Sequence, residues 1–313
     1  MSSPDKDGER IWLMSEVKEI TPQQWIDSFI LGTAQFGMDY GITNKTGRLA
    51  LHDSKSILIE AHKVGIRTLD TAVSYGESEK VLGNILSETR LSFDIITKID
   101  GRQPIRTLTE QLEQSFRNLC VPRVSVLMVH NFEGILRKEV IDLMANLKEM
   151  GLIGKIGVSV YYPHQVEKIL AADIGCGVVQ MPYNVLDRRF DSFLPRLRSV
   201  GIEVHARSVF LQGLLLVDEN SLDAKFRRLD ASLRAINDLS RKNNIPKNAL
   251  LLNYVMARTW PGKVVIGVSS VKEFRDNVRV HEYWGDCLKV VDSLNGLSLE
   301  DESLLIPSNW ASL

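Results

Sequence analysis

Four side chains that could take part in proton transfer occur in turn where apolar segments of the sequence end. Asp70 ends IRTLD, Lys98 ends DIITK and His130 ends VLMVH, while Tyr75 follows in the loop TAVSYGESE. Catalytic groups of parallel barrels project from the carboxyl ends of strands, and neighbouring strands lie about 4.8 Å apart. If these segments are adjacent strands in equal register, an acid, a phenol, an amine and an imidazole share one rim.

This set of groups suits the reduction of a carbonyl group. Hydride that arrives at the carbonyl carbon builds negative charge on the oxygen, which a tyrosine such as Tyr75 can protonate. A neighbouring Lys98 ammonium would lower the pKa of the phenol, and Asp70 would keep that ammonium charged. His130 would orient the substrate oxygen or join the proton relay. Each residue alone also has an ordinary structural explanation, such as a helix cap for Asp70, but their joint occurrence favours a catalytic site.

Short apolar segments with β-strand character alternate with amphipathic segments, which is typical of parallel strands joined by helices. Eight such units in about 250 residues favour a closed (β/α)8 TIM barrel, a single α/β domain, over an open sheet. We predict an N-terminal extension at 1–27, the barrel at 28–280 and a C-terminal tail at 281–313. The predicted strands are 29–34, 66–72, 94–99, 124–130, 155–161, 178–184, 202–209 and 263–269. The helices predicted between them include 77–86, 108–119, 141–151, 163–171, 193–201 and 230–244.

The composition favours a role on small molecules. The 313 residues include 38 Lys plus Arg and 39 Asp plus Glu, so no basic excess indicates nucleic acid or an anionic membrane. No segment approaches the roughly 18 apolar residues of a membrane span, and the N-terminal segment lacks the apolar core of a signal peptide. Cys120, Cys176 and Cys287 lack the spacing of a metal, redox or disulfide motif. We expect a cytoplasmic protein without a metal site.

The four groups and the segments around them resemble the aldo-keto reductase family. LDTAVSYGESEKVLG, IITKI and LMVHN match its D-T-A-x-x-Y-G loop and its strands that end in T-K and V-H. The resemblance runs from about residue 29 to 280 and includes LGTAQFG, KIGVSVY, VVQMPYN and IGVSSVKEFRDN. It implies an NAD(P)H-dependent oxidoreductase that reduces an aldehyde or ketone to an alcohol. In that reaction Tyr75 is the general acid, Lys98 and Asp70 tune it, and His130 positions the carbonyl.

A nicotinamide cofactor is expected at loops of the barrel. No G-x-G-x-x-G or G-x-x-x-x-G-K-[ST] motif follows a strand, which disfavours a Rossmann fold. Barrels commonly bind phosphate with the loops after strands seven and eight, which here are RSVFLQG and GVSSVKEF. The resemblance places Ser159 and Gln180 at the nicotinamide carboxamide, Gly32 and Thr33 beneath the ribose, Ser208 and Gln212 near the pyrophosphate, and Ser270, Lys272 and Asn277 around the adenosine. The same comparison adds Arg207, Gly267 and Ser269 to the predicted cofactor contacts.

Several positions depart from the family pattern. Val160 replaces an Asn that many members have, and Arg207 stands where many have an aromatic residue that stacks on the nicotinamide. Some members hold the 2′-phosphate of NADP with Lys and Arg, where this chain has Gly267 and Glu273. The resemblance favours NADPH, but the Glu273 carboxylate would repel a 2′-phosphate beside it, so NADH is the alternative.

The short C-terminal tail favours a small or sugar-like carbonyl substrate over a bulky one. Trp310 in this tail either packs against the barrel or covers the substrate. Two other functions are open. A cofactor-sensing regulatory protein is favoured by the altered residues Val160 and Arg207, but it has no chemical need for a tuned acid. A cofactor-free isomerase or lyase is disfavoured, because a Schiff-base lysine is better served by neutral surroundings than by a carboxylate.

Overall fold

Eight parallel strands close into a barrel at the centre of the structure, a computed structural model of the chain. The structure describes residues 20–312 except 45–46, 173, 219–220 and 260. Strand β1 pairs with both β2 and β8, so the predicted (β/α)8 barrel is confirmed, with its strands in sequence order. The strands are β1 (Phe29–Gly32), β2 (Thr68–Asp70), β3 (Asp94–Ile99), β4 (Val124–Val129), β5 (Ile153–Ser159), β6 (Cys176–Pro182), β7 (Glu203–Arg207) and β8 (Lys263–Gly267).

Every predicted strand overlaps an observed one, and the clearest differences lie at the carboxyl ends. β2 ends at Asp70 and β7 at Arg207, each two residues before the predicted end. The loop residues Ala72 and Val209 are as buried as strand residues, at 0% and 2% exposure. Apolar residues in the sequence mark buried positions, whether or not those positions pair in a strand. The apolar segments from which we predicted strands therefore continue past the last paired residue. The residues that follow these strands are therefore free to form the loops of the site.

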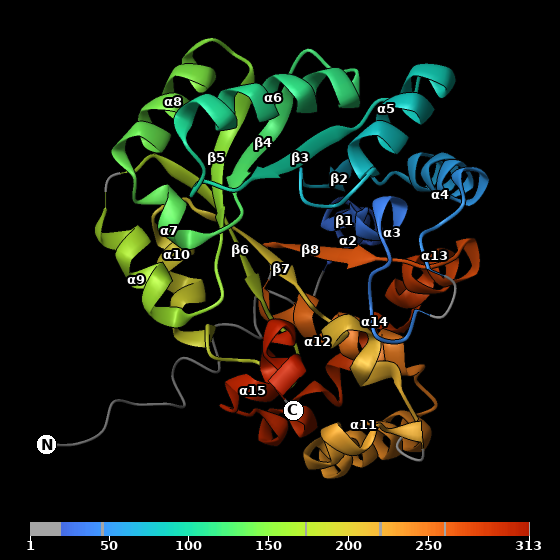
Figure 1. Ribbon diagram of the computed structural model, residues 1–313. Coiled ribbons are helices and arrows are strands. Elements are labelled where there is room, and N and C mark those ends of the chain that lie inside the picture. The colour runs from blue at the N-terminus through green and yellow to red at the C-terminus, as the bar shows by residue number, and fades with distance from the viewer. Residues whose placement is uncertain (1–19, 45–46, 173, 219–220, 260, 313) are drawn as a thin grey trace, which may run out of the picture.

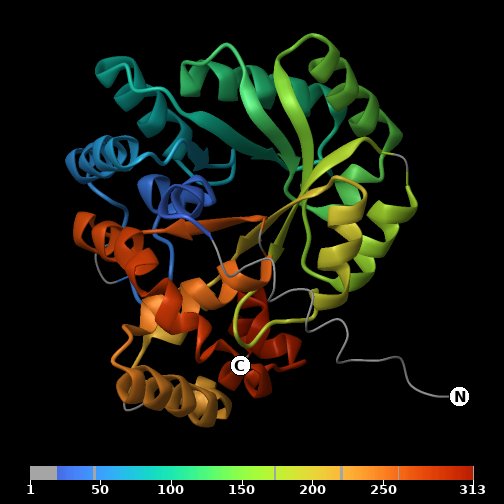
Figure 2. The same cartoon turned by 180° about the vertical axis from the view of Figure 1, so that it is seen from behind.

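Helices lie outside the strands around the barrel (Figure 1, Figure 2). Among the described residues, none of these helices has the length and apolarity that crossing a membrane requires. The longer helices are α4 (Leu51–Val64), α5 (Ser78–Thr89), α6 (Ile105–Leu119), α8 (Lys138–Glu149), α9 (Pro163–Ala171), α11 (Asp230–Asn243), α12 (Lys247–Thr259) and α13 (Val271–Val278). The shorter ones are α2 (Pro22–Asp27), α3 (Ala34–Gly37), α7 (Phe132–Ile135), α10 (Leu194–Ser199), α14 (Trp284–Leu288) and α15 (Glu302–Leu305).

The helices form because their apolar residues recur at helical spacing. In α6, Leu108, Leu112, Ser115 and Leu119 are buried at intervals of three or four residues, so one face packs on the barrel. The six predicted helices correspond to α5, α6, α8, α9, α10 and α11. In the barrel interior a separate apolar cluster fills the space beneath the carboxyl ends of the strands. Its buried members are Ile30, Ile96, Val126, Met128 and Val178.

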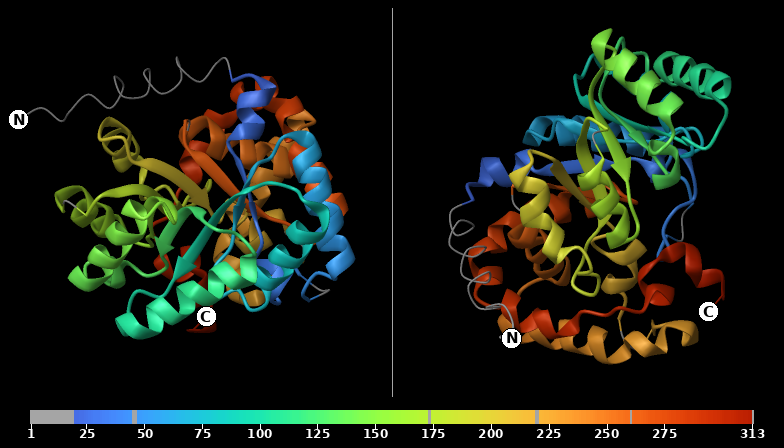
Figure 3. Two further views of the ribbon diagram at one scale, coloured as in Figure 1. Left: turned by 90° about the horizontal axis from the view of Figure 1, so that it is seen from above. Right: turned by 90° about the vertical axis from the view of Figure 1, so that its left-hand side faces the viewer.

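The two ends of the described chain pack against the barrel domain. Trp25 of α2 is 1% exposed, and its Nε1 donates to Asn253 Oδ1 at 3.0 Å, so this helix covers the amino end of β1. Trp310 is buried against Phe226, with ring centroids 4.9 Å apart, so it packs the tail instead of covering a substrate. The C-terminal helices lie beside the α11 segment in two views (Figure 1, Figure 3). Residues 1–19 of the predicted extension lie outside the described residues, and the boundaries of extension, barrel and tail stay predictions.

Candidate active site

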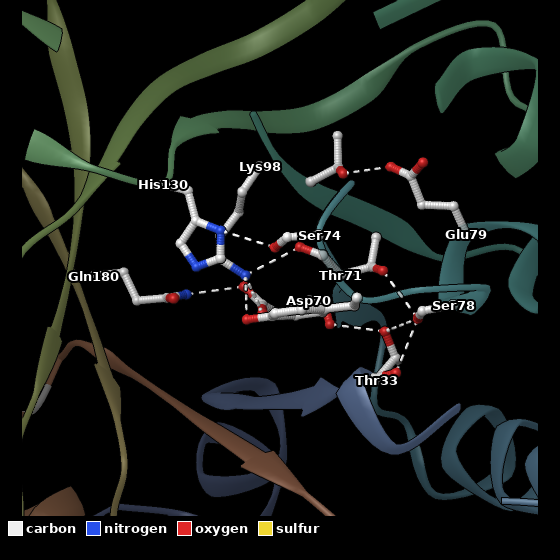
Figure 4. A network of polar contacts seen from close by, with 11 residues as sticks. Thr33, Asp70, Thr71, Ser74, Ser78, Glu79, Lys98, His130 and Gln180 are labelled. Atoms are coloured by element: carbon white, nitrogen blue, oxygen red, sulfur yellow. Dashed lines mark hydrogen bonds and ion pairs between the residues drawn. The ribbon is translucent and has the colours of Figure 1, made fainter. Parts of the chain in front are cut away.

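A buried ion pair between Lys98 and Asp70 lies at the carboxyl ends of β2 and β3 (Figure 4). The Lys98 side chain is 0% exposed and that of Asp70 is 3% exposed. Besides Asp70 Oδ1, Lys98 Nζ donates to the Thr71 carbonyl at 3.0 Å and to Tyr75 Oη at 3.4 Å. The second carboxylate oxygen of Asp70 accepts from Gln180 Nε2 at 2.8 Å. The structure thus brings the predicted acid, amine and phenol into one hydrogen-bonded cluster.

His130, the fourth predicted residue, packs edge-on against Tyr75. The ring centroids are 5.9 Å apart and the ring planes meet at 84°. His130 directly follows β4, and its Nδ1 lies 3.2 Å from Ser74 Oγ. Because Ser74 engages Nδ1, Nε2 is the ring nitrogen that is left for a substrate oxygen.

Burial dominates the proton affinities of this cluster. Burial and the Asp70 carboxylate raise the pKa of Tyr75 above its ordinary value, and the Arg207 guanidinium partly opposes them. The net shift of this pKa is upward, opposite to the lowering expected from Lys98, because burial has the largest effect. Burial lowers the pKa of Lys98, which Asp70 opposes. Burial, Lys98 and Arg207 lower the pKa of His130 to about 4. At neutral pH the phenol is protonated and the imidazole is neutral.

A network of hydroxyl groups holds the loop that carries Tyr75. Thr33 Oγ1 donates to the Asp70 carbonyl at 2.9 Å and lies 2.9 Å from Ser78 Oγ. Ser78 Oγ also donates to the Thr33 carbonyl at 2.8 Å, which ties the β1 loop to the start of α5. At Gly37 any Cβ would overlap the Tyr75 carbonyl oxygen and the Ser78 nitrogen, so only glycine permits this approach. The position of Tyr75 therefore depends on α3 as well as on β2.

A cavity opens beside Tyr75 and Asp70, between the loops after β1, β7 and β8. Eight of the twelve predicted cofactor residues line it, namely Gly32, Thr33, Gln180, Arg207, Ser208, Gln212, Gly267 and Ser269. Ser270, Lys272 and Asn277 line an adjoining hollow, which shares Leu216 and Glu273 with the cavity. Ser159 is 2% exposed and lines neither space, so the structure does not bring it to the others.

The carboxylate of Glu273 accepts hydrogen bonds from Ser269, just before α13 begins at the edge of the cavity. Glu273 Oε2 accepts from Ser269 N at 2.7 Å and from Ser269 Oγ at 2.6 Å. Ser270 Oγ accepts in return from Glu273 N at 3.1 Å, which caps the helix. The nearby cations Lys272 and Arg275 each form an ion pair with a carboxylate. This end of the cavity therefore presents a negative charge.

Residues of the long loop after β1 form a wall of the cavity that we did not predict from the sequence. Gln35, Tyr40, Gly41, Thr43 and Asn44 also line the cavity. The loop meets the β7 loop through a hydrogen bond from Ile42 N to Gln212 O at 3.2 Å. Gln35 Oε1 is buried without a hydrogen-bond partner in the described chain. The polar and aromatic segment GMDYGITN between β1 and α4 was the signal that could have identified this wall.

Known proteins similar to this chain are oxidoreductases. The model of the aldo/keto reductase family matches residues 28–286. An uncharacterized oxidoreductase of Schizosaccharomyces pombe is 28% identical over 274 residues, 84% of this chain and 91% of that protein. The NADH-specific methylglyoxal reductase of Escherichia coli is 28% identical over 188 residues, 50% of this chain and 56% of that protein. The holo form of an aldo-keto reductase from Bacillus halodurans shares the fold, with a TM-score of 0.67, 21% identity and coverage of 84% and 91%.

Replacing Lys98 with Met should lower the free energy of unfolding by about 3–5 kcal/mol, because Asp70 is left as an unpaired buried charge. Urea unfolding followed by circular dichroism measures this change. The double variant Asp70→Asn/Lys98→Met is the matched control, since it removes the stranded charge as well, and it should recover part of the loss. A double variant no more stable than Lys98→Met would show that the unpaired charge is not the cause.

The His130 imidazole should titrate near pH 4 in the folded protein. NMR of labelled histidine side chains measures this midpoint, and the spectrum of His130→Gln identifies the His130 signal. The unfolded chain binds this proton below about pH 6.5. Because the folded pKa is depressed, the contribution of His130 to stability is complete above the unfolded pKa and is lost as the pH falls towards 4. A folded midpoint near the ordinary histidine value would contradict the neutral ring.

Proposed function

The chain belongs to the aldo/keto reductase family, and we propose that Tyr75 is the general acid of its NAD(P)H-dependent reduction of an aldehyde or ketone. One observation carries this proposal: the protonated phenol of Tyr75 lies at the wall of the cavity, 3.4 Å from Lys98 Nζ in the buried ion pair. The phenol is protonated, as a general acid must be before charge develops on the substrate oxygen.

Each residue of the cluster has a separate role in the proposed reaction. A bound nicotinamide supplies the hydride that the carbonyl carbon receives. Tyr75 Oη gives its proton to the carbonyl oxygen, and Lys98 stabilises the phenolate that remains. His130, neutral and fixed by Ser74, orients the carbonyl oxygen next to Tyr75. Asp70 holds Lys98 in place and keeps it charged against the cost of burial.

The described cavity fits a nicotinamide dinucleotide. Gln35 Oε1 and Asn277 Nδ2 are buried without partners among the described residues, one in the cavity and one in the adjoining hollow, and a cofactor atom can complete the hydrogen bonding of each. At Gly267 a Cβ would lie 2.6 Å from Gln35 Oε1, so a larger residue there would displace the Gln35 side chain. We assign eleven of the twelve predicted cofactor residues to this ligand, all but Arg207, with Gln35 in addition, and Ser159 is the least supported because it is buried away from the cavity.

Glu273 favours NADH over NADPH in this site. Its carboxylate lines the cavity and already accepts both donors of Ser269, and an acidic group suits a ribose diol better than a phosphate. Of the cations close to Glu273 in the sequence, Lys272 in the adjoining hollow is paired with Asp276, and Arg275 is paired with Glu60. The family resemblance favours NADPH, whereas the charges around this cavity support the alternative cofactor.

We propose a small or sugar-like carbonyl compound as the substrate and the cytoplasm as the place of the reaction. Trp310 packs against Phe226 and no residue of the tail lines the cavity, so among the described residues the tail supplies no wall for a bulky substrate. The complete set of Asp70, Tyr75, Lys98 and His130 supports an enzyme over a cofactor-sensing regulatory protein.

Replacing Tyr75 with Phe should lower kcat by about 10²- to 10⁴-fold, because the proton donor is lost while the ring is kept. Fluorescence titration should show unchanged NADH binding, and absorbance at the reduced-nicotinamide band measures turnover with a panel of small aldehydes and sugars. Turnover by Tyr75→Phe close to that of the wild type would contradict the assigned acid. Tight cofactor binding by the wild type without turnover on any carbonyl would instead support the regulatory alternative.

Replacing Glu273 with Gln should improve NADPH binding relative to NADH by about 5- to 10-fold, equivalent to about 1–1.4 kcal/mol, because one negative charge is removed. The ratio of the two dissociation constants, from fluorescence titration, measures this preference. Glu113→Gln on the exposed face of α6 is the matched control with the same change in net charge. An equal ratio in Glu273→Gln and wild type would remove Glu273 as a determinant of cofactor choice.

A further inference from the structure

Arg207 presents a guanidinium group in the wall of the catalytic cavity. It is the last residue of β7 and lines the cavity together with Tyr75. Its Nη2 donates to the Val160 carbonyl at 3.0 Å and its Nη1 to Ser208 Oγ at 3.2 Å. The guanidinium carbon lies 4.2 Å from the centroid of the Tyr161 ring. These three contacts fix the plane of the guanidinium.

The positive charge of Arg207 has no protein counter-ion. Among the described residues no carboxylate forms an ion pair with it, and its two hydrogen bonds are to neutral oxygens. Arginine carries five N–H donors, so the remaining ones are available to a ligand. The other cation of the catalytic cluster, Lys98, is neutralised by Asp70. The catalytic end of the cavity therefore carries one uncompensated positive charge.

Two neighbouring arginines show how this chain otherwise treats partly buried guanidinium groups. Arg188 and Arg189, in the loop after β6, have side chains 19% and 9% exposed. Asp191 pairs with Arg188 at 2.6 Å and Asp187 pairs with Arg189 at 2.8 Å. Both structural arginines thus have a carboxylate partner, as the cost of burying a charge requires. Arg207 has no such partner among the described residues, and it lines the cavity, where a ligand can supply one.

The position of Arg207 associates it with the reacting end of the cavity. Its charge lowers the pKa of both the Tyr75 phenol and the His130 imidazole, so it lies close to the two groups that face the carbonyl. The carboxylate of Glu273 is engaged by Ser269 at the start of α13. An anion held by Arg207 would therefore sit beside the carbonyl that Tyr75 protonates.

We propose that Arg207 binds an anionic group of the substrate, so that the carbonyl compound reduced here carries a carboxylate. This inference rests on the proposed reductase function and specifies its substrate class. A planar guanidinium held by Tyr161 and Val160 is suited to bidentate contact with a carboxylate. The anionic group itself is unchanged in the reaction, since hydride adds to the carbonyl carbon and the Tyr75 proton to its oxygen.

The test compares acids with their neutral amides as substrates. The pairs are succinic semialdehyde with 4-oxobutanamide and D-glucuronate with D-glucuronamide. The wild type should prefer the acid of at least one pair in kcat/KM, and Arg207→Gln should lower kcat/KM for that acid by about 10- to 100-fold while changing the amide less than about threefold. Arg207→Lys, which keeps the charge without the planar fork, should retain part of the preference.

Two controls separate this role from others. Arg196→Gln removes the same charge from an exposed position on α10 and should leave the acid preference unchanged. Calorimetry with NADH present should show 4-hydroxybutyrate binding more tightly than 4-hydroxybutanamide to the wild type and equally to Arg207→Gln. This second measurement detects anion binding without turnover.

Several outcomes would overturn the inference. Weaker NADH binding by Arg207→Gln, with equal losses for acid and amide, would assign Arg207 to the cofactor pyrophosphate. Equal losses with unchanged NADH binding would make it a positioning residue for Tyr75. Turnover of the amides without any preference for the acids would refute the substrate class and leave the reductase function standing. No cofactor oxidation with any carbonyl would overturn both.

Discussion

The ion pair between Lys98 and Asp70 is the interaction on which the rest of the site depends. It lies above an apolar barrel interior, where taking two charges out of water costs several kcal/mol per ion before their attraction is counted. The cost is offset only because further groups satisfy the pair, with Thr71 accepting from the ammonium and Gln180 donating to the carboxylate. The carboxyl ends of β2, β3 and β6 must therefore keep fixed positions relative to one another, and the closed barrel holds them there.

The pair in turn determines what its neighbours can do. Burial and the Asp70 carboxylate raise the pKa of Tyr75, so the phenol keeps its proton until a substrate oxygen accepts it. Because Asp70 pairs with Lys98, Arg207 is the cation at this end of the cavity that has no carboxylate partner among the described residues. Two contacts hold the loop of Tyr75 to the segment after β1: the hydrogen bond from Ser78 Oγ to the Thr33 carbonyl and the close approach of Gly37. The position of the acid therefore depends on the segments that follow both β1 and β2.

The sequence predicted most strands and helices of the barrel, because the spacing of apolar residues along a strand or helix depends only on which of its faces is buried. The ends of three strands predicted Asp70, Lys98 and His130, since carboxyl ends of parallel strands meet on one rim. The direction of the pKa shift of Tyr75 was not predictable, because it depends on whether burial or a neighbouring cation has the larger effect. The Glu273 cap and the missing counter-ion of Arg207 depend on which groups meet in space, and Gln35 lies in a loop whose course no periodicity encodes.

Transfer of a label from the cofactor to the substrate tests the central claim most directly. NADH carrying deuterium at the transferable C4 position would be incubated with the wild type and a small aldehyde acid, and the alcohol analysed by mass spectrometry and NMR. A carbonyl reductase places one deuterium on the former carbonyl carbon, and Tyr75→Phe, with its acid removed, should form this labelled product far more slowly. An alcohol without label, or oxidation of NADH without an alcohol, would contradict direct hydride transfer in this cavity.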